Sequence, residues 1–232
     1  MLFRSRCQIF RTDTFIKQAE TGTQPGMRFL AFSPDGKFLA SGAFHYPNVK
    51  IWNAQTGQLV KELPAANEFS DPNASVVFSA DGRELVISTP CESLFWKTSD
   101  WALARRRPRP PKDLAATMSF SSDGKLFAAT QTRNVVRLYD AVTGTVLADL
   151  EAPHSGWISA LSFNHDATQL AVGESRDALR VWDLRQIREQ LADMGLDWDQ
   201  PPRPSGNPGA NAAPVSAKAG IATGDSSPHL PR

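Results

Sequence analysis

A phrase of the type Phe-Ser-x-Asp-Gly recurs along this chain. It stands at residues 32–36, 78–82 and 120–124, and returns at 163–167 in the altered form Phe-Asn-His-Asp-Ala. The steps between its aspartates are 46, 42 and 43 residues, for Asp35, Asp81, Asp123 and Asp166. An aromatic residue follows each phrase with steps of 44, 43 and 43 residues, at Trp52, Trp96, Tyr139 and Trp182. Two markers with one period indicate an internal repeat of about 43 residues.

Each repeat reads as four short strands. An apolar run precedes the Asp-Gly pair, a second follows it, a third ends at the aromatic residue, and a weaker fourth follows a Thr-Gly or Ser-Asp turn. Asp-Gly pairs favour tight turns, since glycine tolerates a positive φ. Four strands per repeat without helical periodicity predict a four-stranded antiparallel sheet. Residues 7–18 align with the third and fourth runs, which places Phe10 at the aromatic position, 42 residues before Trp52.

The unit resembles the WD-repeat (WD40) family of β-propellers, whose repeats carry a similar Asp-Gly phrase and end in Trp-Asp. Only Trp182-Asp183 keeps the full dipeptide, and the resemblance spans roughly residues 7–183. It implies an all-β fold: a propeller segment of about four four-stranded antiparallel blades in a partial or incomplete ring. The phrase LRQIREQLADMGLDWDQPP resembles the end of WD-repeat regions in large bacterial proteins, some with an N-terminal serine/threonine kinase domain.

A short helix and a tail follow the repeats. Asp183 and Gln186 have capping-box spacing, and apolar residues lie three or four apart at Leu184, Ile187, Leu191 and Met194. Gly195 is placed to end the helix. From residue 201 onward the chain is rich in Pro, Ala, Gly and Ser, which predicts disorder. The expected divisions are 1–22 (half of a blade), 23–64, 65–110, 111–150 and 151–183 (blades), 184–200 (helix) and 201–232 (tail).

The chain departs from the family in two ways. Family blades often join a His before the first strand, a Ser or Thr on the second, a turn Asp and the Trp by hydrogen bonds. His154 fits the first position, but the turn positions hold Tyr46, Pro90, Arg133 and Arg176. We therefore expect blades held mainly by apolar packing. The blades are also fewer than a closed family ring needs, so the chain is a fragment or truncated product, is completed by a second copy or partner chain, or closes as a small distorted ring.

Composition excludes several classes. The net charge is +1, and no run of 18 apolar residues occurs. Cys7 and Cys91 make no disulfide framework, which favours a reducing, cytoplasmic location. Phosphate-binding loops, nucleophile elbows and kinase phrases are absent from the sequence, and its four histidines lack metal-ligand spacing. We expect no catalytic residue, no metal and no cofactor.

The resemblance implies that partners bind at the turns between second and third strands and the adjoining connections. The candidate contacts there are Phe44, His45, Tyr46, Pro90, Arg133, Asn134, Arg176 and Asp177. A cluster of Arg105, Arg106, Arg107, Arg109 and Lys112 is interleaved with prolines. It reads as a solvated, Pro-stiffened loop between blades, or alternatively as an anion or nucleic-acid contact.

The function expected from this pattern is a non-catalytic protein–protein interaction scaffold. Its loops, held on a rigid frame of sheets, would bind the partner. The alternatives are a truncated gene product without independent function and a propeller enzyme. Expected partners are proteins of unknown identity, including a second copy that completes the propeller. Neither a nucleic acid nor a membrane is an expected partner.

Overall fold

The computed structural model describes residues 4–46, 48–65, 73–109, 115–152, 156–175 and 178–193. Residues 201–232 make a unit separate from residues 1–200. The predicted disordered tail, His154, Arg176 and Asp177 all lie outside the described residues.

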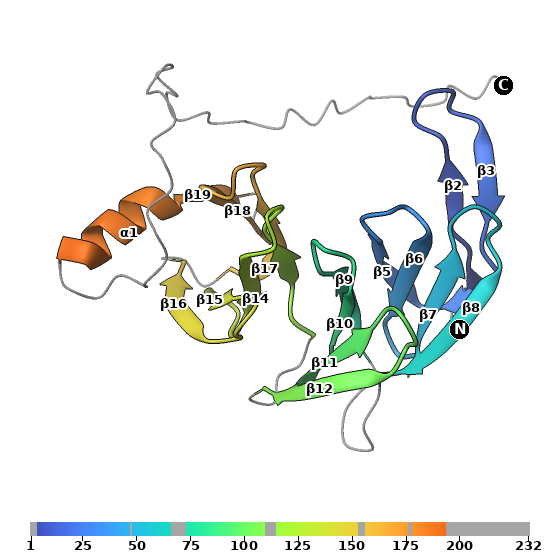
Figure 1. The fold of residues 1–232 in the computed structure, drawn as a ribbon, viewed down its shortest axis with the longest axis horizontal. Coiled ribbons are helices and arrows are strands. Elements are labelled where there is room, and N and C mark those ends of the chain that lie inside the picture. Colours follow the sequence, from blue (N-terminus) through green and yellow to red (C-terminus); the bar gives the residue numbers. More distant parts are fainter. Residues whose placement is uncertain are drawn as a thin grey trace, which may run out of the picture. The chain divides into compact units, whose positions relative to one another are not determined.

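The described residues form antiparallel sheets that follow one another along the chain (Figure 1). The first blade contains β5 (Met27–Phe32), β6 (Phe38–Ala43), β7 (Asn48–Asn53) and β8 (Leu59–Pro64). The second contains β9 (Ser75–Phe78), β10 (Glu84–Ser88), β11 (Glu92–Lys97) and β12 (Leu103–Pro108). The third contains β13 (Met118–Phe120), β14 (Leu126–Thr130), β15 (Val135–Asp140) and β16 (Val146–Glu151). The fourth is a three-stranded sheet of β17 (Ile158–Phe163), β18 (Gln169–Glu174) and β19 (Ala178–Asp183).

Two small sheets precede these blades. Strand β2 (Gln8–Phe10) pairs with β3 (Lys17–Glu20), and β1 (Arg4–Ser5) pairs with β4 (Gln24–Pro25). We call β2 and β3 the half-blade, because they correspond to the third and fourth strands of a full blade. The predicted all-β architecture with four antiparallel blades is confirmed.

The recurring Asp-Gly phrase builds the turn between first and second strands. In the first blade, the Ser33 hydroxyl donates to Asp35 Oδ1 at 2.7 Å, and the Lys37 amide donates to the same oxygen at 3.0 Å. Gly36 has a φ of 70°, a conformation that glycine adopts without a Cβ clash. The same Ser–Asp bond recurs at Asp81 and Asp123. These aspartates are turn residues, as the sequence predicted.

Neighbouring blades are joined by buried apolar clusters. The first and second blades share a cluster that includes Val49, Ile51, Leu85 and Ile87. The second and third share one that includes Phe95 and Tyr139, and the third and fourth share one around Leu138 and Leu170. Buried apolar side chains are the dominant stabilising contribution to such a stack. The half-blade joins the first blade through a further cluster, formed by Ile9, Ala19, Leu39, Trp52 and Ala54.

The first blade contains a polar relay that the sequence prediction missed. Trp52 Nε1 donates to Ser41 Oγ at 2.7 Å, and the Ser41 hydroxyl donates to Gln24 Oε1. Gln24 Nε2 donates to the carbonyls of Ser41 and Asn48, so this fully buried amide is satisfied. Gln24 precedes the first strand, where the family resemblance places a His. The blade is thus held by apolar packing together with a Trp–Ser–Gln relay, which lacks the turn Asp of the full family set.

The second blade lacks that relay. Its β10 residue opposite Trp96 is Leu85, and Ile87 stands two residues further on, where the first blade has Ser41. Trp96 is 8% exposed and its indole Nε1 is buried without a hydrogen-bond partner. The structure thus contains one satisfied and one unsatisfied tryptophan at equivalent positions.

Helix α1 (Leu184–Asp193) follows the fourth blade. Asp183 Oδ1 accepts hydrogen bonds from the amides of Arg185 at 3.0 Å and Gln186 at 3.4 Å, so Asp183 is the N-cap. Leu184 is buried in the cluster between the third and fourth blades, and Ile187 and Leu191 pack against it. The predicted start and apolar face are confirmed, whereas Met194 and Gly195 lie outside the described residues.

Candidate functional site

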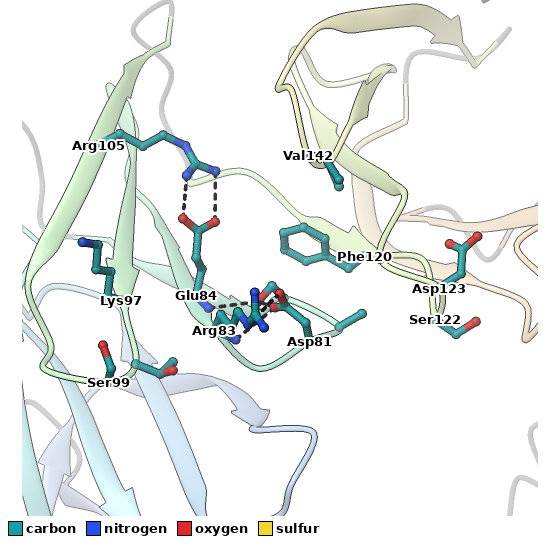
Figure 2. A pocket seen from close by; sticks show the side chains of 15 residues that line it. Asp81, Arg83, Glu84, Lys97, Ser99, Arg105, Phe120, Ser122, Asp123 and Val142 are labelled. Carbon is teal, nitrogen blue, oxygen red and sulfur yellow. Dashed lines mark hydrogen bonds and ion pairs between the residues drawn. The ribbon is translucent and has the colours of Figure 1, made fainter. Parts of the chain in front are cut away.

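A groove of about 920 Å³ lies between the second and third blades (Figure 2). Turns between strands supply most of its lining: residues 79–83 and 122–124 come from the Asp-Gly turns, and 97–99 and 141–142 from the turns between third and fourth strands. Since the rigid sheets fix the ends of these turns, the groove has a preset shape. No sequence motif singled out this groove, because its residues come from two repeats.

Two larger apolar side chains, Phe120 and Val142, line the groove together with Ala80 and Ala141. Phe120 is half-buried and its ring packs on Phe127, with 4.6 Å between centroids. Val142 is 83% exposed, and its side chain points toward Phe120 in Figure 2. An exposed valine and a half-buried aromatic ring that line one groove, with polar turn residues around them, can contact an apolar side chain of a partner.

Charged groups flank this apolar part, and most are already paired. Arg105 makes a two-point contact with Glu84, with 3.0 Å between Nη2 and Oε2. Burial opposes ionisation of Asp81, but hydrogen bonds from Ser79 and the Arg83 amide outweigh it and lower the pKa of Asp81. A carboxylate held ionised in this way is a poor proton donor. Asp81 is therefore a turn and ion-pair acceptor in this groove.

The arginine cluster does not form the predicted loop. Residues 103–108 are strand β12, the fourth strand of the second blade. Arg105 lies 3.9 Å above the Phe95 ring, and Arg106 pairs with Glu92 at 3.0 Å. Arg107 lies 4.4 Å from the Tyr139 ring centroid of the third blade and donates to the Gly144 carbonyl at 3.0 Å. Planar guanidinium groups stack on aromatic faces, so this strand helps to join two blades.

Arg109 is buried at the same junction, with 9% of its surface exposed. Its guanidinium donates to Ser88 Oγ at 2.8 Å, to the Thr89 carbonyl at 2.7 Å and to the Thr130 carbonyl of the third blade at 3.1 Å. Burial lowers the pKa of this group, and its Nε has no hydrogen-bond partner. The four arginines thus contact their own and the next blade.

The predicted rim residues of the first blade lie in the turn after β6. Phe44 forms a bridge with Asn73, and the His45 ring meets it edge-on with 4.1 Å between centroids. His45 is exposed and has a φ of 56°, which is unusual for a residue other than glycine. The Tyr46 hydroxyl donates to Glu62 at 2.9 Å, and this bond raises the pKa of Tyr46.

The rim turns of the second and third blades differ from each other. Pro90 is buried. Asn134 donates to Glu151 at 3.1 Å, within its own blade. Arg133 lies 4.5 Å from the ring centroid of Trp157, which precedes the fourth blade and is 37% exposed. Trp157 was not among the predicted contacts, although an exposed tryptophan beside a rim turn is a signal for one.

The described part of the chain has neither a metal-ligand cluster nor a membrane-spanning helix. No group of three or more His, Cys, Asp or Glu residues is arranged to hold a metal ion there. No helix among those same residues has the length and apolar character needed to cross a membrane.

The fold and its turns define a stack of β-propeller blades. Residues 17–53 and 144–183 match the family model described as "WD domain, G-beta repeat". The first stretch runs from β3 of the half-blade through β7, the third strand of the first blade. The second includes β16 of the third blade and ends with β19, the third strand of the fourth blade. These two stretches are therefore similar to WD40 repeats.

Two longer proteins are similar in sequence to most of this chain. Human telomerase Cajal body protein 1 is 28% identical over 173 residues, which is 71% of this chain and 31% of that protein. SEC12-like protein 2 of Arabidopsis thaliana is 24% identical over 192 residues, which is 77% of this chain and 45% of that protein. The chain thus spans less than half the length of either relative. A chain of Kuenenia stuttgartiensis hydrazine synthase shares the fold, with a TM-score of 0.59 at 20% identity over 71% of this chain and 48% of that one.

Proposed function

We propose that this chain is a non-catalytic protein-interaction scaffold, and that the groove between the second and third blades binds an extended segment of a partner protein. The observation that carries the proposal is the exposed Val142, which lines a groove of about 920 Å³ together with Phe120. A partner's apolar side chain would cover Val142, and its backbone amides would meet the polar turn residues around it.

The state of the acidic groups supports binding over catalysis. Glu84 is held by Arg105, and Asp123 accepts hydrogen bonds from Ser121 and the Lys125 amide. A general acid or base has to exchange a proton with a substrate, and carboxylates that serve as turn or ion-pair acceptors are poorly placed for that. WD40 repeats on rigid sheets fit a scaffold that acts in the cytoplasm.

A second contact surface is proposed at the rim formed by the turns after β6 and β14. Its exposed groups are His45, Arg133 and Trp157, whereas Tyr46 and Asn134 are partly buried. A stacked arginine and tryptophan provide a flat apolar area with charge at its edge, which suits a protein contact.

The test uses the full chain and a phage-displayed library of random linear peptides. Peptides selected on the wild-type chain are measured against Val142→Asp and against Val146→Asp, a control on β16 whose residue is 54% exposed but lies outside the groove. We expect Val142→Asp to weaken binding about tenfold or more, the equivalent of about 1.4 kcal/mol. Val146→Asp should bind as the wild type does.

Two results would count against the groove. Selected peptides that bind Val142→Asp as tightly as the wild type, but lose affinity for Arg133→Ala, would move the site to the rim. A chain that enriches no peptide and shows no cooperative unfolding transition would favour a truncated gene product without independent function.

A further inference from the structure

The third strand of each blade faces two neighbours. In the first blade, Val49 and Ile51 point into the cluster shared with the second blade, whereas Trp52 points into the cluster shared with the half-blade. Side chains alternate along a strand, so residues one and three before the aromatic face the following blade, and the aromatic faces the preceding one.

The third blade repeats this arrangement. Val136 and Leu138 belong to the cluster shared with the fourth blade, and Tyr139 belongs to the cluster shared with the second. All four aliphatic residues at these positions, in the first and third blades, are 0% exposed. At each such junction, one blade contributes an aliphatic face. The next blade contributes the face that carries its aromatic residue, and the two faces are buried against each other.

In the fourth blade, the equivalent aliphatic face is exposed to solvent. Leu179 and Val181 stand three residues and one residue before Trp182, and they are 73% and 52% exposed. Trp182 itself packs on the cluster shared with the third blade, so the preceding junction is complete. Leu179 and Val181 thus form the apolar half of a junction whose counterpart is absent among the residues that the structure describes.

The half-blade carries the opposite face. Ile9 is 7% exposed and packs toward the first blade, while Phe10, at the position of the aromatic residue, is 51% exposed. The equivalent Trp52 and Tyr139 are 2% and 6% exposed. Phe15 and Ile16, in the turn between β2 and β3, extend this apolar surface with 81% and 64% exposure.

We infer that a second copy of this chain docks head to tail, with its Phe10 face on the Leu179 and Val181 face of the first copy. The buried junctions between blades indicate that a second copy is the partner. Each of them already joins an aliphatic face to a face that carries the aromatic residue. The contact is heterologous: two different surfaces meet, and both ends of each copy can take part. It involves neither the groove nor its lining residues, so its failure would leave the proposed function intact.

The test uses two variants of the full chain, Leu179→Asp and Phe10→Asp, each of which blocks one face. Sedimentation velocity gives the mass of each protein over a range of concentrations, and circular dichroism verifies that each has folded. We expect the wild type to self-associate with concentration and each variant to stay monomeric, with a dissociation constant raised about tenfold or more. Val146→Asp, whose exposure matches that of Val181, should associate like the wild type.

Mixing the two variants decides the geometry. Leu179→Asp keeps an intact Phe10 face and Phe10→Asp keeps an intact Leu179 face, so an equimolar mixture should form a dimer although neither variant does alone. A wild type that stays monomeric, a Phe10→Asp variant that associates normally, or a mixture that remains monomeric would each overturn the inference.

Discussion

The two tryptophans Trp52 and Trp96 allow a direct test of the polar relay. They occupy equivalent positions on β7 and β11 and are both buried, but only Trp52 has a hydrogen-bond partner for its indole N–H. Replacing each with phenylalanine removes a similar volume, so the packing losses are comparable. The difference between the two variants isolates the contribution of the N–H group.

The magnitude follows from the two environments. Trp52→Phe removes a hydrogen bond to Ser41, with a net contribution of about 0.5–1.5 kcal/mol. Trp96→Phe removes a buried N–H without a partner, whose desolvation costs about 1–3 kcal/mol in the wild type. We therefore expect Trp52→Phe to lower the free energy of unfolding by about 1.5–4.5 kcal/mol more than Trp96→Phe does.

Urea unfolding followed by circular dichroism measures this difference, provided that both variants share one m-value. In thermal unfolding this free-energy difference corresponds to a Tm difference of about 3–18 °C for a chain of this size. Costs that agree within about 0.5 kcal/mol would refute the reasoning, since mutational additivity is good to that level. So would a Trp96→Phe variant that is the less stable of the two.

Two further predictions concern the turns. A Cβ at Gly57, where φ is 73°, would lie 2.1 Å from the Glu20 carbonyl of the half-blade, whereas one at Gly36 would meet nothing within 4 Å. Gly57→Ala should therefore lower the urea midpoint clearly more than Gly36→Ala, and equal losses would show that the half-blade does not pack there. A hydrogen bond from Ser33 lowers the pKa of Asp35 to about 2, so its stabilising effect is complete above the unfolded pKa near 4 and is lost as the pH falls toward 2. Asp35→Asn should flatten the loss of stability between pH 4 and pH 2, and an unchanged slope there would contradict this role.

The repeat could be predicted from sequence because its signals are local. Asp-Gly turns and aromatic strand ends act within a few residues, so the strand number and the cap at Asp183 were correct. The relay could not be predicted because Gln24, Ser41 and Trp52 meet through hydrogen bonds between separate strands. A glutamine before a strand carries no sequence signal for that role.

The arginine run was predicted as a loop because charged residues interrupt the alternation expected of a strand. In the structure, Arg105 and Arg107 lie over aromatic rings and replace the apolar side chains that would otherwise mark a buried face. The groove was missed for a related reason. Phe120 and Val142 belong to the third blade, Arg105 belongs to the second, and only the stacking of blades brings them together.

Hydrogen exchange of the full chain, with and without a selected peptide, tests the central claim most directly. If the groove binds the partner segment, peptide binding should slow amide exchange at residues 79–81, 83–84, 97–99, 122–124 and 141–142, which line it. The rim turns at residues 44–46 and 133–134 should exchange at unchanged rates. Protection confined to those rim turns, with the groove turns unaffected, would contradict the account.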